Sequence, residues 1–127
     1  MRETLLINDI GNIKSQLKIM LQLSKDEYKI KDKGHFQQAC EKLYKVMIHI
    51  LELKSGYNIR SHNDIYDQFY WQKAGFHIST MTTFTSNMNL LHSYFYEGPN
   101  YPSQSVNIVY NRLLEYVNKI VDRLWGK

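Results

Sequence analysis

Cysteine, proline and long apolar runs are all scarce in this sequence. The single cysteine, Cys40, cannot form an intramolecular disulfide, and it excludes a zinc site built from several cysteines. No stretch approaches the roughly 18 apolar residues of a membrane span, and residues 1–9 lack the apolar core of a signal peptide. These absences favour a cytoplasmic protein with no membrane partner.

The composition is that of a small folded domain. The chain has 127 residues, of which 43% are hydrophobic and 22% charged, and this predicts one domain over 1–127 rather than a multidomain enzyme. The net charge is +4, from 16 Lys and Arg against 12 Asp and Glu. This mild basicity permits contact with nucleic acid but does not require it.

Four stretches carry apolar residues at alternating intervals of four and three, which places one apolar stripe on one helix face. Strand signals are nearly absent. The stripes are Leu6, Ile10, Ile13, Leu17 and Met20; Phe36, Cys40, Leu43, Met47 and Ile50; Met81, Phe84, Met88, Leu91 and Phe95; and Val106, Tyr110, Leu113, Val117, Ile120 and Leu124. We therefore predict an all-α fold.

Helix-breaking residues fall between the stripes. They are Gly34, the segment 55–58, Gly75 and the segment 98–102. Short links favour antiparallel neighbours, so the expected architecture is an up-down bundle of four long helices with one short helix around 65–70. Ser61 is the expected N-cap of that short helix. Ser24 with Glu27 resembles a capping box, so the first helix either breaks there or continues toward Lys33.

The stretch 74–111 contains only one charged residue, Glu97. A monomeric bundle normally places charges on the outer face of each helix, whereas this stretch offers Thr, Ser, Asn and Tyr. An uncharged, aromatic surface is typical of protein interfaces. We expect a homodimer formed through the helix near 77–97, with an ordinary Thr- and Asn-rich surface as the alternative.

Few residues form patterns that indicate chemistry. The five histidines, at positions 35, 49, 62, 77 and 92, form no His-x-x-x-His pair, and we predict neither a metal site nor a cofactor. Cys40 belongs to a core stripe. Arg60 and His62 flank the expected helix start at Ser61, where backbone N–H groups could receive a phosphate; the alternative is a capped helix start with both side chains in solvent.

The segment 87–97 is the most informative. On a helix, His92 lies on one shoulder of the apolar stripe beside Tyr96, while Asn87 and Tyr94 lie on the other. His92 is therefore expected to be neither buried nor free. Glu97 stands at the helix end that disfavours an anion, so we expect a cationic partner such as Arg60, Lys42 or an arginine of a second subunit.

Three segments together resemble the archaeal PaREP family of small helical proteins, which groups with the HEPN (higher eukaryotes and prokaryotes nucleotide-binding) superfamily. They are 34–45, Arg60-Ser61-His62 and 91–97, in the same order and spacing. The resemblance implies an antiparallel helical bundle, often dimeric, and covers the chain from about the second helix onward.

Many HEPN proteins are metal-independent ribonucleases with an Arg-x4-His motif completed across a dimer. The resemblance places His92 at the histidine position and Asn87 at the arginine position, and Asn lacks the charge that would stabilise the transition state. His92-Ser93-Tyr94 also matches a toxin branch whose tyrosine is adenylylated by a partner nucleotidyltransferase.

The sequence thus supports three hypotheses. The first is a non-catalytic or degenerate HEPN-like dimer that binds RNA, a nucleotide or a protein partner, with Arg60, His62, Tyr94, Tyr96 and Glu97 as candidate binding residues. The second is a metal-independent, toxin-like ribonuclease that uses His92. The third is a structural subunit of a toxin–antitoxin or nucleotidyltransferase pair.

Overall fold

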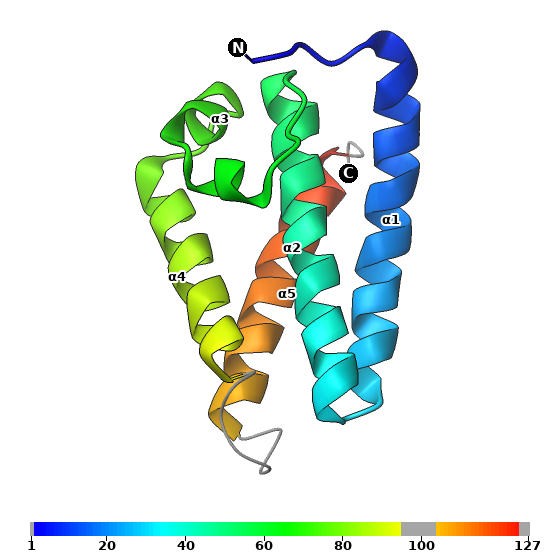
Figure 1. The fold of residues 1–127 in the computed structure, drawn as a ribbon, viewed down its shortest axis with the longest axis vertical. Coiled ribbons are helices and arrows are strands. Elements are labelled where there is room, and N and C mark those ends of the chain that lie inside the picture. Colours follow the sequence, from blue (N-terminus) through cyan, green and yellow to red (C-terminus); the bar gives the residue numbers. More distant parts are fainter. Residues whose placement is uncertain (1, 95–103, 125–127) are drawn as a thin grey trace.

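The computed structural model describes residues 2–94 and 104–124 and is an all-α bundle. Its long helices are α1 (Ile7–Lys29), α2 (Lys33–Ser55), α4 (Ile78–Tyr94) and α5 (Gln104–Leu124). They run alternately down and up, with α2 in the middle, α1 and α4 on either side and α5 behind (Figure 1). The expected up-down arrangement of four long helices is confirmed.

The short crossing element is two helices instead of the expected one. A 3-10 helix, η1 (His62–Tyr66), is capped by Ser61, whose hydroxyl accepts from the Asn63 N–H. The chain then becomes extended at Asp67, which caps α3 (Gln68–Lys73) through a bond from the Phe69 N–H. The extended backbone at Asp67 divides the helix, because an Asp side chain bonds readily to a backbone N–H just ahead of it.

The turn between α1 and α2 differs from the expectation. Helix α1 continues unbroken past Ser24 to Lys29, so the break suggested by the Ser24 capping box is wrong. Asp32 caps α2 by accepting from the His35 N–H at 2.8 Å, and Gly34 therefore lies inside the first turn of α2 rather than between helices. Gly56 and Gly75, in contrast, do end elements, with φ of 79° and 86°.

The apolar stripes face one shared core. Every predicted member of the α2 stripe is buried, and so are the described central members of the α4 and α5 stripes. The α1 stripe is shifted toward the C-terminus: Leu6 is 67% exposed, while Leu21 and Ser24 are buried. No helix among the described residues is both long and apolar enough to cross a membrane.

The segment before α1 crosses the top of the bundle (Figure 1). It pairs with the chain after α2 through a bridge between Thr4 and Tyr57 and a bond from the Leu5 N–H to the Gly56 carbonyl at 2.8 Å. The Asn58 N–H donates to the Glu3 carbonyl at 2.7 Å. These backbone bonds hold residues 3–5 against residues 56–58.

Candidate functional site

Helix α2 exposes a narrow strip of ionisable side chains. Between Ala39 and Glu52, only four side chains are not buried, and all of them titrate or carry charge. They are Glu41, Lys42, Lys45 and His49. Because the rest of this segment is packed into the core, the strip is held rigidly between α1 on one side and the elements after α2 on the other.

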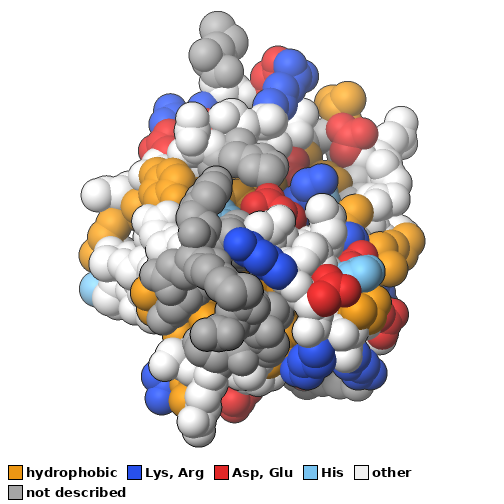
Figure 2. All heavy atoms as spheres, turned by 60° about the horizontal axis from the view of Figure 1, so that its bottom comes forward, with side chains coloured by type: hydrophobic (Ala, Val, Ile, Leu, Met, Phe, Trp, Pro, Cys, Tyr) orange, Lys and Arg blue, Asp and Glu red, His pale blue; other side chains and the backbone are white. Residues whose placement is uncertain are grey.

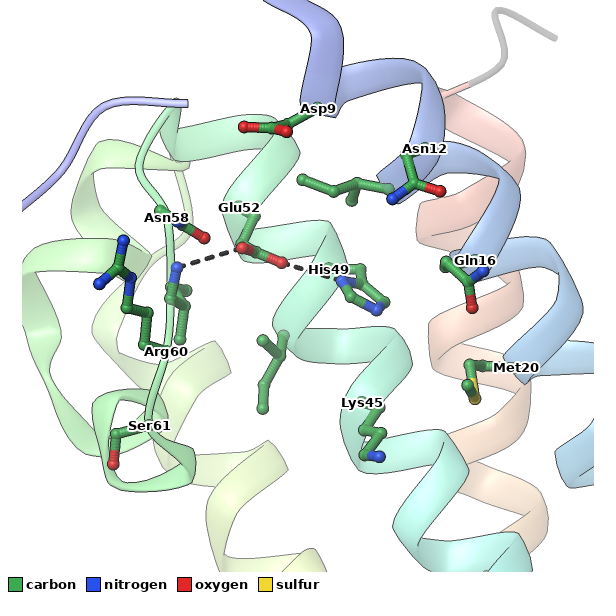
Figure 3. Close-up of a pocket in the computed structure, with 13 residues that line it drawn as sticks. Asp9, Asn12, Gln16, Met20, Lys45, His49, Glu52, Asn58, Arg60 and Ser61 are labelled. Carbon is green, nitrogen blue, oxygen red and sulfur yellow. Dashed lines mark hydrogen bonds and ion pairs between the residues drawn. The ribbon is translucent and has the colours of Figure 1, made fainter. Parts of the chain in front are cut away.

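A hollow of about 490 Å³ lies over the upper part of this strip (Figure 3). It is bounded by α1, α2 and the segment 58–61. Apolar side chains from all three, Ile13, Met20, Ile48 and Ile59, line it together with polar ones. The volume lies within the roughly 300–1,000 Å³ usual for small-molecule sites.

The buried carboxylate of Glu52 organises the hollow. The residue is only 4% exposed, and an unpaired buried charge would be costly. Its two oxygens have separate partners: Oε1 lies 2.9 Å from His49 Nδ1, and Oε2 accepts from the Ile59 N–H at 3.1 Å. Glu52 therefore fixes both the imidazole on α2 and the backbone of the segment that forms the opposite wall.

This arrangement also fixes the tautomer of His49. A carboxylate only accepts hydrogen bonds, so Nδ1 of His49 carries the proton and Nε2 is left as an acceptor in the neutral ring. Figure 3 shows the imidazole in the middle of the hollow, directed from α2 toward Gln16 and Met20 of α1. Nε2 of His49 can thus accept a hydrogen bond from a ligand, or donate one when the ring is protonated.

Two cationic side chains also line the hollow. Lys45 lies one turn before His49 on α2 and has no ion-pair partner among the described side chains. Arg60 enters from the opposite wall, and its Nη2 lies 2.5 Å from Glu3 Oε2. Both members of that pair are largely exposed, at 71% for Arg60 and 54% for Glu3.

Three amides complete the lining, from Asn12, Gln16 and Asn58. Each offers both a donor and an acceptor, which is what the edge of a nucleobase or a sugar hydroxyl requires. Two carboxylates, Asp9 and Glu52, also border the hollow, and Glu52 is already engaged. The hollow thus combines apolar surface, amides and cations, a combination suited to a small polar ligand with an anionic group.

Of the predicted residues whose side chains the structure describes, Arg60 lines this hollow, whereas His92 and Asn87 do not. His62 is the first residue of η1, and its side chain lies outside the described part of the structure. The Ser61 hydroxyl serves as the cap of η1, as the alternative reading of this helix start expected. The Arg60 side chain is 71% exposed to solvent, as that alternative also expected, and it pairs there with Glu3.

His92, on α4, contacts the other end of the α2 strip at Glu41. Its Nε2 is 3.2 Å from Glu41 Oε1, its ring is 6.2 Å from that of Tyr44, and its side chain is 33% exposed. The expectation that His92 is neither buried nor free is therefore confirmed. Glu41 precedes His49 by eight residues, or about 12 Å along the helix axis. The structure thus separates His92 from the hollow that contains Arg60.

Asn87 does not face His92. The two residues are five positions apart on α4, which corresponds to about 140° around the helix. The Asn87 amide donates to the Thr83 carbonyl of its own helix at 2.8 Å. Of the remaining candidates, Tyr94 ends α4 with its side chain outside the described part, and Tyr96 and Glu97 lie outside the described residues altogether.

The cations suggested as partners of Glu97 have other partners here. Arg60 is paired with Glu3, and Lys42 Nζ lies 3.1 Å from Glu27 Oε1. Across residues 2–94 and 104–124, no group of three or more His, Cys, Asp or Glu side chains is placed to hold a metal ion.

Sequence reasoning missed Lys45, His49 and Glu52 as a group. A signal was present: these residues recur at intervals of four and three within the otherwise apolar run 43–53. That spacing puts all three on one helix face.

No family model matches the chain, and comparisons with curated proteins and with solved structures found no match. The resemblance to PaREP and HEPN proteins therefore stays a prediction.

Proposed function

We propose that this helical bundle is a binding module for a nucleotide, either free or at the end of an RNA chain, and that the ligand sits in the hollow between α1, α2 and residues 58–61. One observation carries the proposal: buried Glu52 fixes His49 beside Lys45 in a hollow that also has amides and apolar walls. Cations suit a phosphate, amides suit a base edge, and apolar side chains suit the flat face of a base.

A single nucleotide fits these features better than a long RNA track. On the face shown in Figure 2, positive and negative side chains are interspersed, whereas binding along many phosphates uses clustered Lys and Arg. Lys42, the other lysine of the α2 strip, is already paired with Glu27. The ligand's phosphate contacts are thus concentrated at the hollow.

The proposal includes a degenerate, non-catalytic HEPN-like bundle. Support comes from the three segments that resemble PaREP proteins and from the four antiparallel long helices. Asn87 at the position of the family's arginine supports the loss of catalysis. Asn87 is turned away from His92 around α4 and bonds to its own helix. It does not supply the charge of a catalytic arginine.

Binding to the hollow can be measured by calorimetric titration with the four ribonucleoside 5′-monophosphates. We expect wild-type protein to bind at least one of them, and Lys45→Ala and His49→Ala to weaken that binding about tenfold, the loss of a charge-assisted hydrogen bond. Lys119→Ala, an exposed lysine on α5, is the matched control and should leave binding unchanged. Equal affinities of all four proteins would refute the hollow as the site.

We also propose that the chain forms a homodimer through α4. The described part of α4 carries no Asp, Glu, Lys or Arg, and its outer side exposes Leu90 at 42% and Ile78 at 37%. The side of the bundle where α4 lies shows mainly uncharged side chains (Figure 2). Such a surface is close in composition to interface cores.

The dimer can be tested by light scattering after size-exclusion chromatography. We expect Leu90→Lys to convert a wild-type dimer to a monomer, because it places a charge in the interface. Ile108→Lys is the matched control, since Ile108 is 45% exposed on α5. A monomeric wild type, or dissociation by both variants alike, would count against α4 as the interface.

The second candidate function is a metal-independent ribonuclease that uses His92. The specific observation in its favour is the 3.2 Å separation of His92 Nε2 and Glu41 Oε1, since a carboxylate can orient a histidine for proton transfer. This candidate requires RNA cleavage in EDTA that disappears in His92→Ala. Absence of cleavage by both proteins would leave the binding function.

A nucleotidyltransferase partner is a further part of the proposal. It is supported by His92-Ser93-Tyr94, which matches the modified segment of the toxin branch. A nucleotidyltransferase gene adjacent to the one for this chain, and its transfer of an adenylyl group to Tyr94 but not to a Tyr94→Phe variant, would support this pairing.

A further inference from the structure

Arg60 lies between two hollows. Its side chain lines the large hollow described above and also a smaller one of about 170 Å³, bordered by Arg2, Glu3 and Tyr70. In the structure, the guanidinium is bound to Glu3 on the side of the smaller hollow. Figure 3 shows Arg60 directed away from His49, toward the outer edge of the large hollow. The strongest hydrogen-bond donor of the site is thus turned aside.

Glu3 is placed there by contacts that do not depend on Arg60. The backbone around it is held by the bonds between residues 3–5 and 56–58. On the preceding residue, Arg2 Nη2 lies 2.6 Å from Asp67 Oδ2, and its guanidinium lies 3.9 Å from the centre of the Phe69 ring. The backbone of Glu3 is therefore held beside residues 56–58 whether or not Arg60 binds its carboxylate.

The pair between Glu3 and Arg60 is easily exchanged. Both side chains are more than half exposed, and exposed ion pairs contribute little because water competes for both partners. A phosphate offers the guanidinium the same bidentate acceptor geometry as a carboxylate, with more negative charge. Arg60 can turn to such a ligand without leaving a buried charge unpaired.

Resting on the nucleotide-binding function proposed above, we infer that Arg60 is the residue that recognises the ligand's phosphate, and that Glu3 is an internal competitor for it. The ligand is then a nucleotide, which carries a phosphate, and not a nucleoside, which does not. Lys45 and His49 hold the ligand from α2, and Arg60 closes on the phosphate from the opposite wall after releasing Glu3. The segment 2–6 thereby lowers the affinity of the site for anionic ligands.

The test is a calorimetric comparison of Glu3→Gln, Arg60→Gln and the double variant with the wild type. The titrants are the nucleoside 5′-monophosphate that binds the wild type best and the matching nucleoside. Glu3→Gln should bind the monophosphate about two- to fivefold more tightly, the range of an exposed ion pair, and the nucleoside unchanged. Arg60→Gln should bind the monophosphate more weakly, and the double variant should match Arg60→Gln.

Glu115→Gln is the matched control, because it raises the net charge equally and breaks an exposed pair, with Lys119, on α5. An equal gain in affinity for Glu115→Gln would show a general charge effect and overturn the competition. A Glu3→Gln protein that binds the monophosphate with wild-type affinity would also overturn the competition. If the wild type binds but Arg60→Gln binds equally well, the role of Arg60 fails while the binding function stands. Absence of binding by every variant refutes both.

Discussion

Glu52 Oε1 lies 2.9 Å from His49 Nδ1 in a position where Glu52 itself is nearly inaccessible to water. The other oxygen of the same carboxylate accepts from the Ile59 N–H, so one buried side chain ties α2 to the segment that follows it. The first contact orients the imidazole, and the second holds the opposite wall of the hollow. The site and the local stability of this part of the bundle thus depend on one carboxylate.

Glu52→Ala should lower the free energy of unfolding by about 3 kcal/mol, because it removes two hydrogen bonds to a charged group and leaves the buried Ile59 N–H without its acceptor. Glu52→Gln keeps an oxygen for that N–H and should cost less. Urea denaturation measures both. Glu115→Ala on the surface of α5 is the control, with an expected change below about 0.5 kcal/mol. A similarly small change for Glu52→Ala would contradict the bridging role.

The helices could be predicted because their apolar residues repeat with the helical period. The α2 and α5 stripes were predicted correctly from Phe36 to Ile50 and from Val106 to Ile120. Helix ends were less predictable, because capping is decided by which side chain reaches a backbone N–H. Asp32 does so at α2, although Gly34 has the stronger sequence signal for a break.

The site was harder to predict than the fold. Glu3 and Arg60 are 57 positions apart and meet only because the first residues pair with the chain after Gly56. No local pattern indicates such a contact. At Ser24 the prediction fails in the opposite way. A local capping pattern is present, but the Ser24 hydroxyl bonds to Ala39 and Tyr110 instead of capping a helix. Local patterns indicate possible bonds, and packing decides which of them form.

Ser24 and Tyr110 form a buried polar link between α1 and α5. Ser24 Oγ donates to the Ala39 carbonyl at 2.7 Å, and the Tyr110 hydroxyl lies 2.6 Å from Ser24 Oγ and donates to the Ser24 carbonyl at 3.1 Å. We expect Ser24→Ala and Tyr110→Phe each to lower the free energy of unfolding by about 1–2 kcal/mol. In a double-mutant cycle their effects should not add, because they share a bond. Additive effects in urea denaturation would contradict the link.

Cys40 should be chemically silent in the folded protein. Burial raises the pKa of its thiol, since the thiolate would have to form in the core, and the residue has no exposed surface. We expect almost no reaction with a thiol-specific disulfide reagent at pH 8, and one thiol per chain after unfolding in urea. Rapid labelling of one thiol per chain under native conditions would show that α2 is not packed as described.

Asp67 should make stability depend on pH in the acid range. The bond from the Phe69 N–H, and then the pairing with Arg2, hold the pKa of Asp67 below its ordinary value of 3.8. The folded chain therefore binds fewer protons than the unfolded chain. The stabilisation is present above the ordinary pKa and is lost as the pH falls through the lowered one.

Asp67→Asn retains the cap of α3 but not the charge, so it isolates this contribution. We expect the variant to be less stable than the wild type at pH 7 by a few tenths of a kcal/mol, because both Asp67 and Arg2 are over a third exposed. The urea midpoints of the two proteins should converge as the pH is lowered toward about 2–3, where the wild-type carboxyl is protonated. A difference that stays constant from neutral to acid pH would mean that the charge of Asp67 does not contribute.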